Sequence, residues 1–200
     1  MAGNTTVVLV ATTDPDAVTE CCSSLTERYR VQTTTDGDEA LERLDDADVV
    51  LVDSDLRTES GTVVATEIDR LARPHATAVL RSADQEFESR HGTDIPGDRL
   101  VKPVNENDLR ETVDRLARRV RYDALMDECA TLAAKRGELE SHAHANDSDE
   151  EYAAVQRRLA ELFDELDEVV ATFDGDDFRA AFTACNFAAG TGTQQVERFS

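Results

Sequence analysis

The sequence predicts an α/β protein: a doubly wound parallel sheet over residues 1–121, followed by a C-terminal α-helical hairpin. Two observations predict this fold class. Up to about residue 121, short β-branched runs alternate with helical patterns, which is typical of a parallel sheet covered by helices on both faces. Beyond that point the strand-like runs stop, and two long apolar stripes with helical spacing follow.

Five strands are predicted in the first part of the chain. They are expected at Val7–Val10, Tyr29–Thr33, Val49–Val52, Ala76–Leu80 and Arg99–Val101. Short runs rich in β-branched residues and bounded by turn residues are typical of strands. The third run is the most apolar and leads straight into Asp53, whereas the second is more polar.

Helices are expected after the strands. The predicted helices cover residues 14–27, 39–44, 61–72 and a segment that begins near Asn105. Asp14 is a suitable N-cap for the first helix, and Pro15 suits its first turn, where a missing backbone N–H costs nothing. In the last helix, apolar residues recur every three or four positions from Leu109 to Val120 and predict one buried face. Residues 82–97 are the least regular part of this domain.

The predicted hairpin covers residues 122–183. A five-residue step from Val120 to Leu125 breaks the phase of the apolar stripe, and we place the domain boundary there. After a polar break at residues 142–147, Ser148 and Glu151 form a capping box for the second helix. That helix carries a heptad stripe made of Tyr152, Val155, Leu159, Leu162, Leu166, Val169 and Phe173. Two such helices are expected to pack antiparallel, and residues 184–200 are expected to form a loose tail.

The composition is strongly acidic. Asp and Glu number 43 against 21 Lys and Arg, which gives a net charge of −22, while 40% hydrophobic residues indicate a folded chain. This bias is typical of a halophilic protein, because concentrated salt screens repulsion among surface carboxylates. Nucleic acid is not an expected partner, since such binding depends on basic groups that neutralise phosphates. The main basic cluster, interpreted as a solvated helix face, comprises Arg115, Arg118, Arg119 and Arg121.

The expected location is the cytoplasm. We find no charged-then-apolar leader and no apolar run of about 18 residues, so neither a signal peptide nor a membrane span is predicted. The cysteines have no zinc-site spacing and are interpreted as reduced thiols: Cys21, Cys22, Cys129 and Cys185. His142 and His144, near Asp147, are interpreted as residues of a solvated loop rather than as metal ligands.

Candidate functional residues follow the strands. Asp53 follows the third strand, Ser82 the fourth and Lys102 the fifth, while Thr12 and Thr13 follow the first. In an open parallel sheet these carboxyl ends share one edge, so the side chains are expected to meet there. A carboxylate beside an ammonium and a hydroxyl can accept a phosphoryl group, because the carboxylate attacks while the other two groups bind the transferred oxygens.

These residues resemble the landmarks of receiver domains of response regulators, over about residues 6–121. The resemblance consists of Asp53 after a strand, Gly61 eight residues later, Ser82-Ala83 after a strand, and Lys102-Pro103 before the last helix. It implies a CheY-like, flavodoxin-like sheet in which Asp53 is the phosphoacceptor, Ser82 the switch hydroxyl and Lys102 the phosphate-contacting cation. It also implies a cis peptide bond before Pro103.

The sequence departs from the receiver pattern at two places. Receivers usually end the first strand with two acidic residues that hold Mg²⁺, and here Thr12 and Thr13 replace both. Mg²⁺ binding is expected to be weakened, because only Asp53, helped by Asp14 or Asp55, remains to supply carboxylate ligands. Arg99 stands where the switch aromatic of the family usually lies.

The C-terminal part, from about Tyr122 to Phe182, resembles the HalX domain that follows receivers in haloarchaeal proteins. The matching residues are Arg121-Tyr122-Asp123, Leu132–Lys135, Glu150–Tyr152, and Asp177-Phe178 before Ala180–Phe182. The resemblance implies no catalytic activity. The heptad stripe leaves two explanations open, a coiled-coil seam of a homodimer or burial against the preceding helix.

The favoured function is a response regulator or receiver-like adaptor of a two-component phosphorelay, which acts through protein–protein interaction and is not an enzyme. Its expected partners are a sensor histidine kinase and an output protein. One alternative is a phosphohydrolase of the haloacid-dehalogenase type that uses Asp53 and Asp55, since a strand leads into Asp-x-Asp. Another is a pseudo-receiver that signals without phosphorylation. A DNA-binding regulator is disfavoured by the charge and by the lack of a basic recognition helix.

Overall fold

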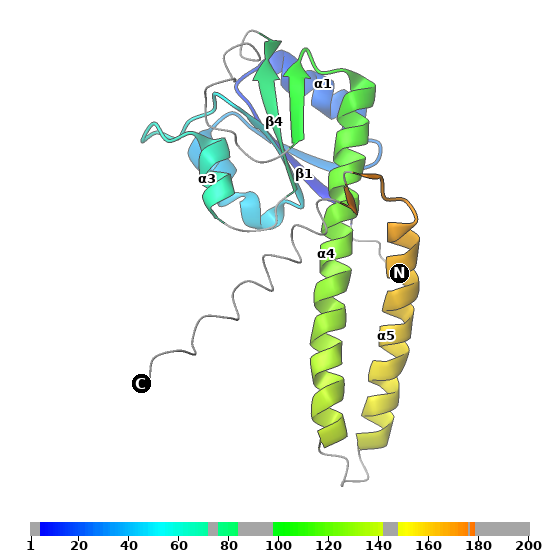
Figure 1. Ribbon diagram of the computed structural model, residues 1–200. Coiled ribbons are helices and arrows are strands. Elements are labelled where there is room, and N and C mark those ends of the chain that lie inside the picture. The colour runs from blue at the N-terminus through cyan, green and yellow to red at the C-terminus, as the bar shows by residue number, and fades with distance from the viewer. Residues whose placement is uncertain (1–4, 72–75, 84–97, 142–147, 176, 179–200) are drawn as a thin grey trace, which may run out of the picture. The chain divides into compact units, whose positions relative to one another are not determined.

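The computed structural model of the protein describes residues 5–71, 76–83, 98–141, 148–175 and 177–178. The chain divides into two compact units, Met1–Val120 and Arg121–Ser200. Strands and short helices make up the described part of the first unit (Figure 1). Long helices make up most of what is described in the second. In the described ranges no helix is long and apolar enough to cross a membrane.

The sheet of the first unit confirms the predicted fold class. Its described strands are β1 (Val7–Ala11), β2 (Arg30–Thr34), β3 (Val49–Asp53), β4 (Ala76–Ser82) and β5 (Asp98–Lys102). They lie in the order β2-β1-β3-β4-β5, and every neighbouring pair is parallel. Each strand lies within two residues of the segment predicted for it, because the β-branched runs set both the position and the buried character of the strands.

Helices cover both faces of this sheet. The described helices of the unit are α1 (Pro15–Leu25), α2 (Gly37–Glu42), the 3₁₀ turn η1 (Leu44–Asp46), α3 (Val64–Arg70) and the first part of α4 (Glu106–Ser141). Successive side chains of a strand point to opposite faces. Val8 therefore packs in a core with α1 and α4, whereas Leu9 packs in a second core with α2 and α3. The sheet is thus doubly wound.

Side-chain capping and turn formation determine where α1 and α3 begin. The Asp14 side chain accepts hydrogen bonds from the backbone N–H groups of Asp16 and Ala17 and so caps α1. The helix predicted from residue 61 begins only at Val64. The reason is a turn in which Gly61, at φ +86°, donates its backbone N–H to the carbonyl of Thr58. Such a φ is left-handed and favours glycine.

The long helix α4 runs through the predicted domain boundary without interruption. Val113 and Leu116 belong to the core of the first unit, and Leu125 and Cys129 belong to the core of the second. The break in phase between Val120 and Leu125 therefore marks a change in what the helix packs against. Backbone hydrogen bonds of a helix do not depend on which face is buried, so the helix continues.

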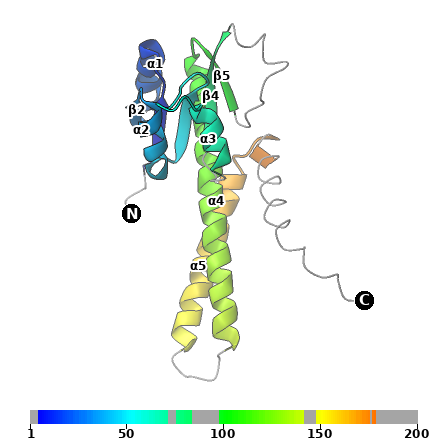
Figure 2. The ribbon, with the colours of Figure 1, turned by 90° about the vertical axis from the view of Figure 1, so that its left-hand side faces the viewer.

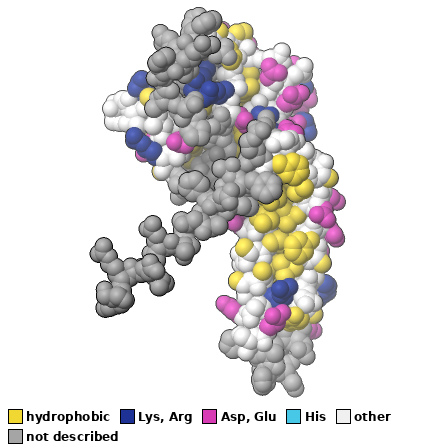
Figure 3. All heavy atoms as spheres, in the orientation of Figure 1, with side chains coloured by type: hydrophobic (Ala, Val, Ile, Leu, Met, Phe, Trp, Pro, Cys, Tyr) yellow, Lys and Arg dark blue, Asp and Glu magenta, His cyan; other side chains and the backbone are white. Residues whose placement is uncertain are grey.

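The second unit contains a hairpin of α4 and α5 (Ser148–Val170), which lie side by side in Figures 1 and 2. Its core comprises Leu125, Cys129, Leu162, Leu166 and Val169. Heptad positions of α5 are thus buried against the preceding helix. Hydrophobic side chains also gather on the visible surface of the hairpin (Figure 3).

Several predictions of the sequence lie outside the described residues. These are the loop with His142, His144 and Asp147, the residues Ala180–Phe182, Cys185 and the tail 184–200. Among the described cysteines, Cys21, Cys22 and Cys129 are free thiols. Burial raises the pKa of Cys21 to about 12, so this thiol is protonated and unreactive at neutral pH.

Candidate functional site

Asp53 ends the central strand β3, all five residues of which are buried. Its side chain is the group around which the candidate site is built. Only 4% of the residue is exposed to solvent. A buried carboxylate must be satisfied by donors or by a cation, because it has lost its hydration.

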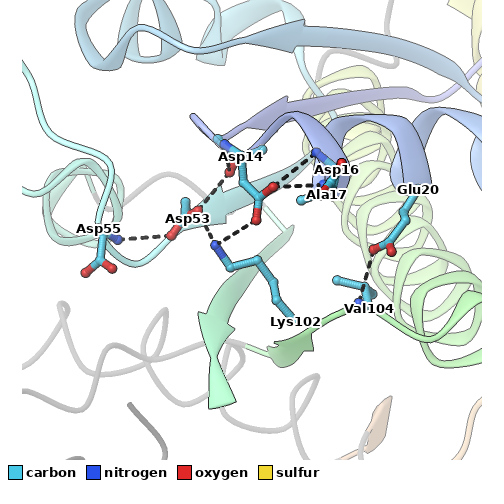
Figure 4. Close-up of polar contacts among 9 residues, drawn as sticks. Asp14, Asp16, Ala17, Glu20, Asp53, Asp55, Lys102 and Val104 are labelled. Carbon is cyan, nitrogen blue, oxygen red and sulfur yellow. Dashed lines mark hydrogen bonds and ion pairs between the residues drawn. The ribbon is translucent and has the colours of Figure 1, made fainter. Parts of the chain in front are cut away.

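Lys102 supplies the cation. It ends β5, and its Nζ donates to Oδ2 of Asp53 at 2.8 Å. The same ammonium lies 3.5 Å from Oδ2 of Asp14, the residue that caps α1 (Figure 4). The structure therefore brings together the ends of β1, β3 and β5, as expected from their shared edge of the sheet.

Thr12, which the sequence places at the same edge of the sheet, supplies a second donor to Asp53. This residue is fully buried, and its Oγ1 donates to Oδ2 of Asp53 at 2.7 Å. The same Oγ1 accepts the backbone N–H of Asp14 at 3.1 Å. Thr13, by contrast, is exposed. Of the two threonines that follow β1, Thr12 thus contacts Asp53, and a polar side chain at the carboxyl end of a strand is the signal in the sequence for such a contact.

Ser82 lies beside Lys102. The two residues are partners in the register of β4 and β5 and line the same open pocket of about 430 Å³. The other lining residues are Asp14, Asp16, Ala17, Thr19, Glu20 and Pro103. The hydroxyl and the ammonium therefore face one space next to the end of α1.

Arg99 does not join this group. It is exposed and lies three positions before Lys102 on β5, so its side chain leaves the opposite face of the strand. The Lys102–Pro103 peptide bond is cis. Directly after it, the backbone N–H of Val104 donates to Oε2 of Glu20 on α1 at 3.2 Å.

Two pKa values in the site are shifted. The pKa of Asp14 is lowered, above all by the hydrogen bond from the backbone of Ala17; burial opposes this, and Asp16 and Lys102 add to it. For Lys102, burial is the largest influence and acts to lower the pKa. The hydrogen bond and charge of Asp53, with those of Asp14, outweigh burial and raise the pKa overall. Lys102 therefore stays protonated and paired across the neutral range.

The residues present do not fit a Mg²⁺ ion. Mg²⁺ requires octahedral oxygen ligands, usually including one or two carboxylates. Oδ2 of Asp53 and Oδ2 of Asp14 converge, but the Lys102 ammonium lies between them. Oδ1 of Asp53 accepts the backbone N–H of Asp55 at 3.2 Å. Among the described residues, no group of three or more His, Cys, Asp or Glu side chains could hold a metal.

Asp55 contributes its backbone N–H to the site. Its side chain is exposed and points away from Asp53 in Figure 4. A haloacid-dehalogenase mechanism needs both acids of Asp-x-Asp beside the reacting group, so the described geometry favours a single-carboxylate site over the hydrolase.

Arginines of the basic cluster form ion pairs instead of a free basic surface. Arg115 and Arg119 lie 3.2 Å and 3.5 Å from the carboxylate of Asp98. Arg121 lies 3.5 Å from that of Glu165. The charge of these three arginines is thus offset by neighbouring acids.

Both parts of the chain are similar to known proteins. Residues 118–182 match the model of the HalX domain. A protein of Haloferax volcanii, described as "Putative transcriptional regulator", is 34% identical over 138 residues, which are 68% of this chain but only 23% of that longer protein.

Solved receiver structures share the fold of the N-terminal part. The REC domain of AraT, a response regulator from Geobacillus stearothermophilus, matches with a TM-score of 0.52 and 21% identity over 60% of this chain and 98% of its own. The signal receiver domain of an HD domain-containing protein from Pseudomonas fluorescens matches with a TM-score of 0.52 and 14% identity over 62% and 95%. The chain therefore carries a HalX domain at residues 118–182, preceded by a unit with the fold of a CheY-like receiver domain.

Proposed function

We propose that this protein is a cytoplasmic, receiver-type signalling protein of a two-component system, which acts through protein–protein contacts and not as an enzyme. Residues 1–121 are the receiver and residues 122–183 the HalX output part, with residues 184–200 as a tail. Asp53 occupies the phosphoacceptor position. A sensor histidine kinase and an output protein are its partners.

One observation carries the proposal: Oδ2 of Asp53 receives both the Lys102 ammonium, at 2.8 Å, and the Thr12 hydroxyl, at 2.7 Å. The first contact is what a phosphoacceptor site needs, because the cation can bind the oxygens of a transferred group. The second contact comes from Thr12, which occupies a position where the receiver pattern has a metal-binding acid. The Thr12 hydroxyl donates a hydrogen bond to the Asp53 carboxylate but supplies no negative charge to bind Mg²⁺.

We therefore propose that Asp53 is phosphorylated slowly. In the transfer from acetyl phosphate, a carboxylate oxygen of Asp53 forms a bond to phosphorus, the bridging P–O bond breaks and acetate leaves. Ser82 and Lys102 are placed to bind the transferred oxygens. Without strong binding of a divalent ion, the charge that develops on the phosphoryl group is poorly offset.

The test is labelling with acetyl phosphate and Mg²⁺, followed by intact-mass spectrometry. We expect little or no gain of about 80 Da in the unaltered chain. The double variant Thr12→Asp/Thr13→Asp is expected to gain the label faster, and the added change Asp53→Asn to abolish it. Circular dichroism must show that each variant is folded.

Rapid labelling of the unaltered chain at Asp53 would show that the acidic pair is dispensable and would contradict the proposed role of Thr12. If neither the chain nor the acid-restored variant is labelled, the pseudo-receiver alternative replaces phosphoryl transfer. Turnover of an aryl phosphate that Asp53→Asn and Asp55→Asn both abolish would favour the hydrolase instead.

The Haloferax relative is named as a regulator of transcription. We propose that this chain contributes to such regulation through a protein partner. The net charge of −22 and the ion-paired arginines support contact with protein over direct contact with DNA.

A further inference from the structure

The α4–α5 hairpin has two open sides, because each helix buries one stripe against the other and leaves two flanks. One side is crossed by ion pairs between the helices. They join Glu128 to Arg158 at 2.8 Å, Lys135 to Glu151 at 2.7 Å, and Arg121 to Glu165 at 3.5 Å. This side is polar and its charges are largely matched.

The opposite side carries Met126 of α4 and Phe163 of α5. At 3.6 residues per turn, Met126 lies about 160° around its helix from Glu128, and Phe163 about 140° from Arg158. Both side chains are therefore turned away from the ion pairs. They are 39% and 58% exposed, which is unusual for residues of their size. We call this side the Met126–Phe163 face.

Exposed small residues continue this face along α4. Ala130 and Ala133 follow Met126 by four and seven residues, so they lie over it on successive turns. Figure 3 shows hydrophobic side chains gathered in a band along the hairpin. Such a band on a strongly charged surface marks an interaction site, and methionine adapts readily to a partner.

Acidic residues border the face. Asp167 lies four residues after Phe163, Asp127 directly follows Met126, and both are exposed. Farther along α4, Arg136 is 3.5 Å from Glu140, so its charge is offset. A second copy of this chain would bring the same acidic borders against one another, and each copy has a net charge of −22. A partner with basic borders fits better.

We propose that the Met126–Phe163 face docks a cationic amphipathic α-helix of another protein. The apolar side of that helix lies over Met126 and Phe163, and its Lys or Arg side chains lie toward Asp127 and Asp167. A third helix in this position completes a three-helix bundle and removes the exposed apolar side chains from water. The inference rests on the proposed function only in taking the hairpin as the output part, and it does not depend on phosphorylation of Asp53.

Two dye-labelled helical peptides of about 18 residues test the proposal by fluorescence anisotropy with the full chain. One has a leucine stripe flanked by lysines, and the other has glutamates in place of the lysines. In about 0.5 M KCl, we expect binding of the lysine peptide only. Affinity should fall as KCl rises, because salt screens the contribution of the acidic borders.

Matched variants separate the face from non-specific attraction. Phe163→Ser is expected to weaken binding of the lysine peptide about tenfold or more, as expected for an aromatic anchor. Leu71→Ser, which changes another exposed hydrophobic residue (45% exposed), should leave it unchanged. Asp167→Asn should weaken binding more than Glu168→Gln, which removes the same charge about 100° farther around α5.

Binding that is absent, equal for both peptides, or unaffected by Phe163→Ser would overturn the proposal. So would a dimer of the unaltered chain in sedimentation velocity that Phe163→Ser dissociates, because a second copy would then cover the face. Labelling of Asp53 is measured separately, so failure of the docking proposal is distinguishable from failure of the proposed receiver chemistry.

Discussion

Thr12 donates a 2.7 Å hydrogen bond from its Oγ1 to Oδ2 of Asp53, although 41 residues separate the two in the sequence. Both side chains are buried, at 0% and 4% exposure. The hydroxyl therefore replaces one of the water molecules that the carboxylate lost on folding. The buried carboxylate is thus held by an ammonium and a hydroxyl.

Removal of this hydroxyl tests its structural value. We expect Thr12→Val, which keeps the shape of the side chain, to lower the free energy of unfolding by about 1.5 to 3 kcal/mol, as for other hydrogen bonds to charged groups. Denaturation by guanidinium chloride measures it. Thr13→Val is the matched control, and because Thr13 is exposed its effect should stay within about 0.5 kcal/mol. Equal effects of the two changes would mean that the hydrogen bond contributes nothing.

The pair of Lys102 and Asp53 should show strong coupling. Lys102→Met leaves a buried carboxylate without its cation, so we expect a loss of about 3 kcal/mol in unfolding free energy. Adding Asp53→Asn removes the uncompensated charge and should recover part of this loss. A double-mutant cycle from denaturation curves measures the coupling, expected at about 1 to 3 kcal/mol. Additive effects would show that the 2.8 Å contact has little energetic value.

Asp14 should make stability depend on acid pH. Its pKa in the folded protein is below the ordinary value of 3.8, chiefly because the backbone of Ala17 donates to it. The carboxylate form therefore stabilises the fold at pH values above about 3.8, and this contribution is lost as pH falls through the lowered pKa. Denaturation midpoints between pH 6 and pH 3 measure it.

Asp14→Asn is the control for that pH series, because asparagine also caps helices but does not titrate. The difference in midpoint between the unaltered chain and Asp14→Asn should shrink below about pH 4. A difference that stays constant over the whole range would rule out a lowered pKa.

The hairpin should depend more on its apolar core than on its ion pairs. Leu162 is fully buried in the core of the second unit. We expect Leu162→Ala to lower the free energy of unfolding by about 2 to 5 kcal/mol. Arg158→Gln removes contacts to Glu128 and Glu165, but all three side chains are partly exposed, so its effect should be clearly smaller. Thermal unfolding followed by circular dichroism compares the two. A larger loss for Arg158→Gln would reverse this order.

The order of residues is enough to predict the sheet and the edge at which the site lies. The run Val49–Val52 is apolar throughout, so it must be covered on both faces, and β-branched runs between helical patterns leave few other folds. Parallel strands end at one edge, so the sequence alone places Asp53 and Lys102 together. The sequence also predicts that Arg99 and Lys102 lie on opposite faces of β5, because residues three positions apart on a strand point to opposite faces.

Which atoms contact one another depends on the packing of the folded chain. The spacing of apolar residues tells which face of an element is buried, but the contact between Thr12 and Asp53 depends on strand register and on side-chain direction across two strands. The same limit applies to α4: the break in phase after Val120 lies at the division between the two compact units, but it does not reveal that one helix continues from the core of the first unit into the core of the second. Periodicity reports burial, whereas contacts between distant residues are set by packing of the whole chain.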